Sequence, residues 1–113
     1  MTQPSLTLTA AEFQVLVALA DGDKHGYAIG KEVAARTEGQ VQLRAATLYT
    51  VIKRLLDNGS IDESAARPDP ELDDERRRYY RLTPRGRKAA EAEALRLEVT
   101  AKQARAKLRP RKA

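Results

Sequence analysis

The spacing of apolar residues in the first forty positions predicts two helices. The first begins at Thr9 and Glu12, which have the spacing of a capping box, in which each side chain accepts a hydrogen bond from the other residue's backbone N–H. Its helical repeat is carried by Phe13, Leu16, Val17 and Ala20, and turn-forming residues 21–23 should end it. A second helix is expected from about His25 to Thr37, with Ile29 and Val33 on its inner side.

Residues 46–59 form the most informative segment, because the two faces of the predicted helix differ in chemistry. One face is apolar and must pack on a core: Leu48, Val51, Ile52 and Leu55. The opposite face is small, hydroxylated and cationic: Ala46, Tyr49, Thr50 and Lys53. Asn58-Gly59 supplies the C-terminal stop. Such a helix can offer its outer face to the major groove of DNA, although an ordinary amphipathic surface helix would show the same repeat.

The hydrophobic period then changes from that of a helix to that of strands. Residues 60–65 alternate weakly and residues 76–83 alternate better, so both are predicted strands. Residues 67–75 between them hold two prolines and five acids, which indicates a solvated loop. Three helices followed by a two-stranded hairpin is the order of a winged helix-turn-helix. The predicted fold class is therefore mainly α (α+β), with this DNA-binding domain over residues 1–83.

A long final helix is predicted to begin with Thr83 as N-cap and Pro84 as its first residue. Its apolar positions are spaced alternately four and three residues apart, as in a coiled coil: Ala90, Ala94, Leu97, Ala101, Ala104 and Leu108. Running to about Arg109, it would be about 37 Å long, which is too long for so small a core to cover. Residues 84–113 are therefore predicted to form a dimerisation helix and a basic tail.

The first helix is expected to add to this dimer interface from its outward side, through Val15 and Leu19. The alternative for the final helix is a solvated helix whose alanines are incidental.

Charge favours an anionic partner such as nucleic acid. The 113 residues carry a net charge of +5, and residues 76–88 hold seven bases and no acid, which suits contacts with phosphates. Six further bases and no acid follow Thr100, although a basic tail is often simply solvated. The segment 62–75, with seven acids and one base, should instead be repelled by phosphates. It either stays away from the DNA groove or pairs with neighbouring arginines.

The residue types present argue against several other classes. The absence of cysteine excludes disulfides, thiolate metal sites and cysteine nucleophiles. The single histidine, His25, leaves no cluster for zinc or a catalytic triad, and we interpret it as a capping or packing residue of the second helix. No run approaches the length of a membrane span, and no signal-peptide core is present. We expect a cytoplasmic protein that is not an enzyme, uses no cofactor and does not contact membranes.

Several short motifs occur in an order that is typical of one family. They are Leu16-Val-Ala-Leu-Ala-Asp-Gly22, His25-Gly-Tyr27, Thr47-Leu-Tyr49, Lys53-Arg-Leu55, Asn58-Gly59 and Tyr79-Tyr-Arg-Leu-Thr-Pro-Arg-Gly86. Over about residues 9–95 the chain resembles the PadR transcriptional regulators. Its single C-terminal helix resembles the smaller subfamily, which dimerises through that helix. The resemblance implies a homodimeric winged-helix repressor of a palindromic operator, released by an unknown small-molecule effector.

The resemblance also implies roles for residues at matching positions, since the family places its third helix in the major groove and its wing on the backbone or minor groove. By matching position, Thr47, Tyr49 and Lys53 become candidate contacts with double-stranded DNA, as do Arg76 and Arg77 in the wing. The outer face of the helix adds Ala46, Thr50 and Arg54, and Arg44 is an extra cation where this chain departs from the family. Tyr49 could alternatively pack its ring on a neighbouring helix. The candidate dimerisation residues are Ala94, Leu97, Ala101, Ala104 and Leu108.

Three functional hypotheses therefore stand beside one another. The first is a sequence-specific DNA-binding transcriptional regulator that acts as a repressor. The second is a winged-helix module that binds another protein through the final helix and the acidic loop. The third is a nonspecific, nucleoid-type DNA binder.

Overall fold

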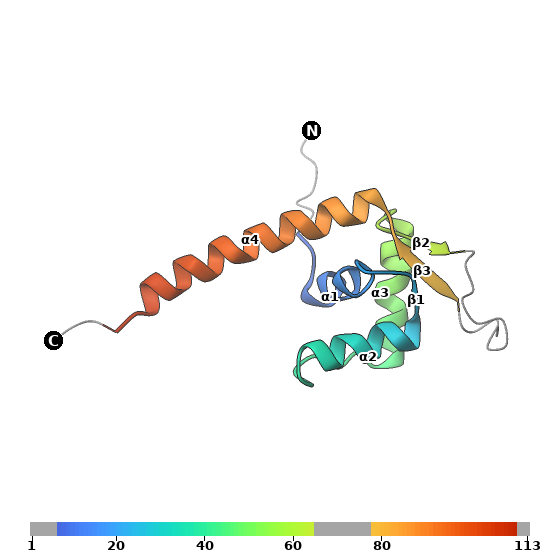
Figure 1. Cartoon of the computed structure of the whole chain (residues 1–113), viewed down its shortest axis with the longest axis horizontal. Helices are drawn as coiled ribbons and strands as arrows, with labels where there is room; N and C mark the ends of the chain where they lie inside the picture. Colours follow the sequence, from blue (N-terminus) through green and yellow to red (C-terminus); the bar gives the residue numbers. More distant parts are fainter. Residues whose placement is uncertain (1–6, 65–77, 111–113) are drawn as a thin grey trace.

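The computed structural model describes residues 7–64 and 78–110. Four helices and three short strands follow one another along the chain: α1 (Ala10–Ala18), β1 (Lys24–His25), α2 (Gly26–Arg36), α3 (Ala45–Asp57), β2 (Ile61–Ser64), β3 (Tyr79–Leu82) and α4 (Pro84–Leu108). Helices α1 to α3 gather on one side of the small sheet, and α4 leaves this unit as a long arm (Figure 1). The element order confirms a winged helix-turn-helix with a long C-terminal helix. The predicted acidic loop and the wing arginines 76 and 77 lie outside the described residues.

The sheet has one strand more than the predicted hairpin. Its order is β1-β3-β2, with both neighbouring pairs antiparallel. Ile61 stands opposite Leu82 in the β2–β3 pair, and Lys24 stands opposite Tyr80 in the β1–β3 pair. The two residues of β1 are too few to show an alternating pattern, so this strand could not be recognised from the sequence.

The core lies between the three short helices and the sheet. All four residues predicted on the inner face of α3 are buried, as are Ile29 and Val33 of α2. Ile61 of β2 and Tyr80 of β3 close the core from the side of the sheet. The outer face of α3 is therefore held in place by a well-packed inner face.

The buried face of α1 differs from the predicted one. Val15 and Leu19, expected to point outward, are 0% and 2% exposed, whereas Ala20 is exposed and Phe13 and Val17 are only partly buried. The true inner stripe starts with a polar residue, Glu12, and continues through Val15, Leu16 and Leu19. Because most of this nine-residue helix is apolar on every side, its periodicity pointed to the wrong face. The proposal that Val15 and Leu19 form part of a dimer interface is therefore wrong.

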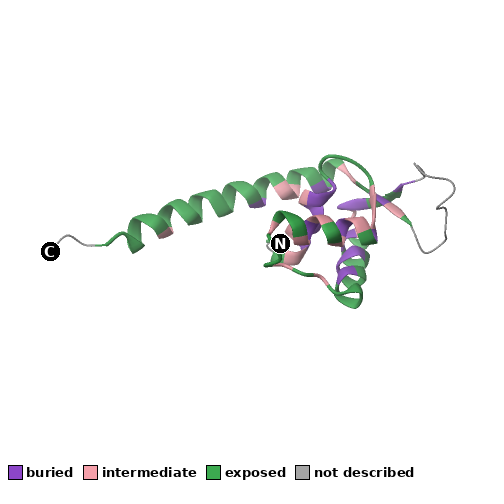
Figure 2. Ribbon diagram, turned by 60° about the horizontal axis from the view of Figure 1, so that its bottom comes forward, coloured by how far each residue is buried: buried purple, intermediate pink, exposed green. Residues whose placement is uncertain are grey.

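Helix α4 is anchored at its first turn and then extends away from the domain. Thr83 caps it, with its Oγ1 accepting a hydrogen bond from Gly86 N at 3.0 Å, and Pro84 occupies the first turn as predicted. Gly86 packs against the Ser60 carbonyl so closely that an added Cβ would lie 2.9 Å from the carbonyl carbon and nearer still to the oxygen. Figure 2 shows that the projecting half of α4 is almost entirely exposed. Within the described ranges, no helix is both long and apolar enough to cross a membrane.

Candidate nucleic-acid interface

The outer face of α3 is exposed along its whole length. Ala46, Thr47, Tyr49, Thr50, Lys53 and Arg54, all predicted DNA contacts, are exposed on this helix. The Thr50 hydroxyl donates a hydrogen bond to the Ala46 carbonyl oxygen at 2.9 Å, so this side chain lies close to its own helix. The Lys53 side chain is 77% exposed, with its Nζ 3.4 Å from Asp57 Oδ2. Such a surface ion pair contributes little to the stability of the fold, so an approaching phosphate can replace the Asp57 carboxylate beside Lys53.

Tyr49 both packs on a neighbouring helix and faces solvent. Its ring lies across the start of α2, where a Cβ added to Gly26 would come within 2.5 Å of the Tyr49 hydroxyl. The residue nevertheless remains 44% exposed. The glycine of the His-Gly-Tyr motif thus makes room for the tyrosine of α3. The alternative that the Tyr49 ring packs on a neighbouring helix is confirmed, and its contact with DNA stays a prediction. Burial, together with the neighbouring Tyr49, raises the pKa of Tyr80 beneath the contact between Tyr49 and Gly26.

Arg54 holds α3 to α1 rather than standing free. Its Nη1 lies 3.3 Å from Oε2 of Glu12, which is only 6% exposed. The other carboxylate oxygen of Glu12 accepts a hydrogen bond from Thr9 N at 2.8 Å, and Thr9 Oγ1 accepts one from Glu12 N at 3.1 Å. The predicted capping box is therefore confirmed, and it also fixes a side chain of α3. Half of the Arg54 side chain stays exposed and can still approach a phosphate.

The beginning of α3 is the one helix start in the described chain without a side-chain cap. Thr9, His25 and Thr83 cap the other three helices, and His25 does so through Nδ1, which accepts from Ala28 N at 3.1 Å. At α3 the N-cap position holds Arg44, an exposed cation that makes no capping bond. Backbone N–H groups at a helix start carry partial positive charge and attract anions. Arg44 and this helix end together suit a phosphate group.

Two residues of α2 extend the exposed face, and the sequence prediction missed both. Tyr27 is 68% exposed, and Lys31 Nζ lies 5.5 Å from the centre of its ring. A hollow of about 400 Å³ separates them from Tyr49 and Ala45 at the start of α3. The four-residue spacing of Tyr27 and Lys31 places them on one helix face, and that spacing was the available signal.

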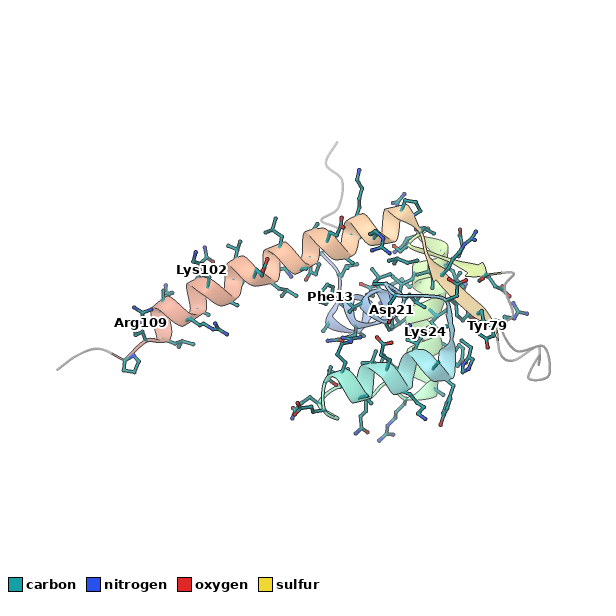
Figure 3. The ribbon with its side chains drawn as sticks, in the orientation of Figure 1. Phe13, Asp21, Lys24, Tyr79, Lys102 and Arg109 are labelled. Atoms are coloured by element: carbon teal, nitrogen blue, oxygen red, sulfur yellow. The ribbon has the colours of Figure 1, made fainter. Side chains whose placement is uncertain are left out.

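Other cations near the sheet are already paired with acids of the same domain. Lys24 Nζ lies 2.5 Å from Asp21 Oδ1 and 3.3 Å from Glu32 Oε1 (Figure 3). Burial alone would lower the pKa of Lys24, but these two carboxylates outweigh it and raise that pKa above its ordinary value.

In the described part of the wing, both arginines lie close to acids of the opposite strand. Arg78 Nη1 lies 3.4 Å from Glu63 Oε1, and Arg81 Nη2 lies 3.9 Å from Asp62 Oδ2. All four side chains are largely exposed, so these pairs are weak and can open. Arg44, which forms no side-chain capping bond, and Lys53, whose pair with Asp57 is exposed in the same way, are the cations that the outer face of α3 presents to a phosphate.

Comparison with known proteins identifies the family. The protein-family model described as "Transcriptional regulator PadR-like family" matches residues 15–92 of this chain, which include α2, α3, the wing and the first part of α4. The chain belongs to the PadR-like family of transcriptional regulators. The resemblance inferred from the sequence motifs is thereby confirmed.

Individual proteins and solved structures are also similar to this chain. An uncharacterized protein X of Lysinibacillus sphaericus is 34% identical over 73 residues, which cover 65% of this chain and slightly less than two thirds, 64%, of that protein. A transcriptional regulator from Clostridium thermocellum is 30% identical, with a TM-score of 0.72 over 88% of this chain and 90% of that chain. Bacillus subtilis PadR, solved in complex with operator DNA, shares the fold at 20% identity, with a TM-score of 0.62 over 74% of this chain and 46% of that chain.

The predicted dimerisation seam of this PadR-like chain lies on the surface of α4. Leu97 and Leu108 are 41% and 80% exposed, Ala94 and Ala101 are exposed, and Ala104 is partly buried. Ala90 differs from them because it packs against the core. Lys102 and Arg109 lie on the same projecting half (Figure 3). Five apolar positions thus follow the arm without a partner in the described part of the chain.

A second hollow, of about 730 Å³, lies where α4 passes the start of α1 and the end of α3. Leu8, Ala89 and Ala92 supply apolar lining, and Arg85 and Lys88 supply positive charge. Glu93 at its edge is 7% exposed and is paired with Arg96, whose hydrogen bond holds the pKa of Glu93 below its ordinary value. Nowhere in the described residues do three histidine, aspartate or glutamate side chains gather to hold a metal ion.

Proposed function

We propose that this PadR-like regulator is a homodimeric repressor that binds a palindromic operator through α3 and is released by a small-molecule effector. The observation that carries the proposal is the form of α3. Four buried residues hold it against the core, while its opposite face is exposed, small and cationic and begins at an uncapped helix end. The operator complex of Bacillus subtilis PadR, which has the same fold, adds support.

The residues of α3 divide into two roles in this proposal. Arg44, Lys53 and the start of α3 bind phosphates, which supply most of the affinity and none of the sequence preference. Ala46 and Thr50 are small, so the helix can approach base edges in the major groove closely enough to read them. Tyr49 lies between the two groups, with its hydroxyl available to a phosphate.

A two-fold dimer would present two α3 helices to one face of the duplex. The centres of the two half-sites should then lie about 10 base pairs, or a multiple of that, apart. We expect selection from random DNA to enrich a palindrome with this spacing. Binding without enrichment would favour the nucleoid-type alternative, and no binding at all would favour the protein-interaction alternative. If footprinting shows that the protein binds one asymmetric half-site at full affinity, the proposal of a dimer that contacts two half-sites is contradicted.

Replacement of Lys53 by alanine tests the placement of α3. Loss of one phosphate contact on each subunit should flatten the plot of log affinity against log salt concentration by about 0.9 per contact. Lys102→Ala is the matched control, because it removes the same charge from the projecting half of α4. The proposal predicts a changed slope for Lys53→Ala and an unchanged slope for Lys102→Ala. Equal slopes for Lys53→Ala and the natural protein would remove α3 from the interface.

The hollow beside α4 is the candidate site for the effector. Its volume lies in the range of small-molecule sites, and it adjoins both α4 and the end of α3. A molecule bound there would touch the two elements whose relative placement decides how the α3 helices of a dimer are spaced. A screen of small carboxylic acids by thermal shift and operator release, with Arg85→Ala as a comparison, tests this part of the proposal.

A further inference from the structure

We propose that Glu12 is a positioning residue for DNA binding, which holds Arg54 in one place and so restricts its contact to a phosphate of the operator. This inference rests on the placement of α3 against DNA in the proposed function, and it names a residue of α1 that controls that face. Arg54 lies on the exposed side of α3, and its Nη1 lies 3.3 Å from Oε2 of Glu12, which is 42 positions earlier in the chain. One cation of the DNA face is thus held by a neighbouring helix.

Burial of Glu12 distinguishes this ion pair from the other pair on α3. The Glu12 side chain is 8% exposed, whereas both members of the Lys53–Asp57 pair are largely exposed, at 77% and 68%. An exposed pair separates at little cost, because water replaces the partner. Departure of Arg54 would instead leave a buried carboxylate without a counter-charge, which is costly. Arg54 therefore stays with Glu12 when DNA approaches, whereas Lys53 can follow a phosphate.

The carboxylate that holds Arg54 is itself fixed by the first turn of α1. Glu12 Oε1 accepts a hydrogen bond from Thr9 N at 2.8 Å, and Glu12 N donates one to Thr9 Oγ1 at 3.1 Å. A carboxylate tied to a backbone N–H cannot turn to follow a moving guanidinium group. In residues 7–64 and 78–110, Arg54 is the one basic side chain that forms an ion pair with Glu12. The start of α1 therefore sets the position of Arg54.

The exposed half of Arg54 borders a hollow that can receive a phosphate. This hollow, of about 380 Å³, lies between the start of α1 and the outer face of α3, and Thr9, Thr47 and Thr50 line it together with Arg54. The bond to Glu12 uses Nη1 of Arg54, and a guanidinium group has further N–H donors on its other nitrogens. A phosphate in the hollow can therefore contact Arg54 without separating it from Glu12.

A fixed, neutralised arginine favours the operator over other DNA. Nonspecific affinity comes from cations that neutralise phosphates wherever these lie, and the pair of Arg54 with Glu12 carries no net charge. Base contacts hold the operator in one register on α3, so the same phosphate enters the hollow in every complex. Other DNA takes many positions relative to α3 and gains little from an arginine that cannot move. Glu12 therefore raises the ratio of specific to nonspecific affinity.

The variant E12Q tests this role while keeping the capping box. A glutamine carboxamide oxygen can still accept from Thr9 N, and glutamine is the other residue that capping boxes use, so the circular dichroism should stay that of the natural chain. The freed Arg54 should then follow the phosphates of any duplex. For a scrambled duplex, the slope of log affinity against log salt concentration should steepen by about 0.9 for each added contact, which is about eightfold tighter binding at 0.1 M salt. Affinity for the duplex enriched by selection from random DNA should rise less, because that duplex already has the contact.

Two controls separate the position of Arg54 from net charge. D57N removes the same charge beside a cation of the same helix, but from an exposed pair, and should change the slope little. The double variant E12Q/R54Q has the net charge of the natural chain and should return the slope for the scrambled duplex to the natural value. Equal steepening in E12Q and D57N would show that net charge alone acts and would overturn the inference. A gain that persists in E12Q/R54Q would overturn it as well.

The remaining outcomes separate this inference from the proposed function. An unchanged slope for E12Q, with a flatter slope for Lys53→Ala, would overturn the role of Glu12 and keep α3 on the DNA. An equal gain of E12Q for the selected and the scrambled duplex would overturn the effect on specificity. Unchanged slopes for both Lys53→Ala and E12Q would remove α3 from the interface and overturn the proposed function too.

Discussion

The substitution Gly86→Ala tests how α4 is attached to the domain. Gly86 has an ordinary helical backbone, so its role is the close approach of two backbones and not an unusual conformation. An alanine Cβ would lie 2.9 Å from the Ser60 carbonyl carbon, whereas ordinary contact begins at 3.4 Å. A Leu82 methyl group would also lie 3.0 Å away, but the two nearest atoms belong to the Ser60 backbone, so turning a side chain aside cannot relieve the clash. The first turn of α4 would have to move away from Ser60.

Overpacking of this kind costs about 1–3 kcal/mol, and the better helix propensity of alanine returns up to about 1 kcal/mol. We therefore expect Gly86→Ala to lower the free energy of unfolding by about 1–2 kcal/mol. The matched control is Gly30→Ala inside α2, where the new Cβ would sit 3.6 Å from a Leu48 methyl group, at ordinary contact distance. That variant should gain up to about 1 kcal/mol.

Urea denaturation followed by circular dichroism measures the stability of both variants, at one protein concentration because the proposed dimerisation would contribute to stability. The expected result is a lower urea midpoint for Gly86→Ala and a higher one for Gly30→Ala. If Gly86→Ala is as stable as the natural chain, the backbone contact between α4 and Ser60 does not constrain the domain.

Three further predictions concern the DNA face, the α4 seam and acid stability. Gly26→Ala should push the Tyr49 ring aside at little cost in stability and weaken operator binding about tenfold, as measured by a titration at fixed salt; unchanged affinity would show that the ring position is unimportant. Leu97→Asp should sediment as a monomer that keeps its helical circular dichroism and loses operator binding, while Leu95→Asp on the opposite stripe should remain a dimer; the reverse result would move the interface to that stripe. The pKa of Glu93 is lowered by Arg96, so the stabilisation from this pair is present above the ordinary value of 4.5 and is lost as pH falls through the folded-state pKa. Glu93→Gln should therefore flatten the acid limb of stability against pH, and an identical acid limb would show that Arg96 does not stabilise the charged form.

A helix or strand could be predicted from the sequence where its own residues carry the pattern of apolar and polar positions, and not where it depends on contacts with distant residues. Helix α3 was recognised with its correct inner face because its 13 residues separate apolar from polar positions cleanly. Helix α1 was located correctly and turned to the wrong face, since its inner stripe includes Glu12 and its outer side includes Phe13 and Val17. The two-residue strand β1 exists only through its pairing with β3, and pairing partners cannot be read from so short a segment.

The site was partly predictable for the same reason. The exposed face of α3 followed directly from the helical repeat. The bond between Arg54 and Glu12 joins residues 42 positions apart, and nothing local in either segment indicates it. The approach of Tyr49 to Gly26 is likewise a contact between two helices, although the glycine of the His-Gly-Tyr motif was visible in the sequence.

The attachment of the C-terminal half of α3 to α4 and α1 suggests how the arm of the proposed dimer would control DNA binding. Near the C-terminal end of α3, the Thr83 hydroxyl donates a hydrogen bond to the Gly59 carbonyl oxygen at 2.7 Å, and Gly86 packs on Ser60. The start of α4 is therefore fixed to the residues that follow α3. On the side of α3, Arg54 joins this helix to the capping box of α1 through Glu12. With α3 fixed to the arm in this way, a change in how two α4 helices pack would alter the distance between the two α3 helices of a dimer. It would leave the contacts of each α3 with its half-site unchanged. In the proposed dimer, the spacing between half-sites would therefore be the property of the operator on which the packing of α4 acts.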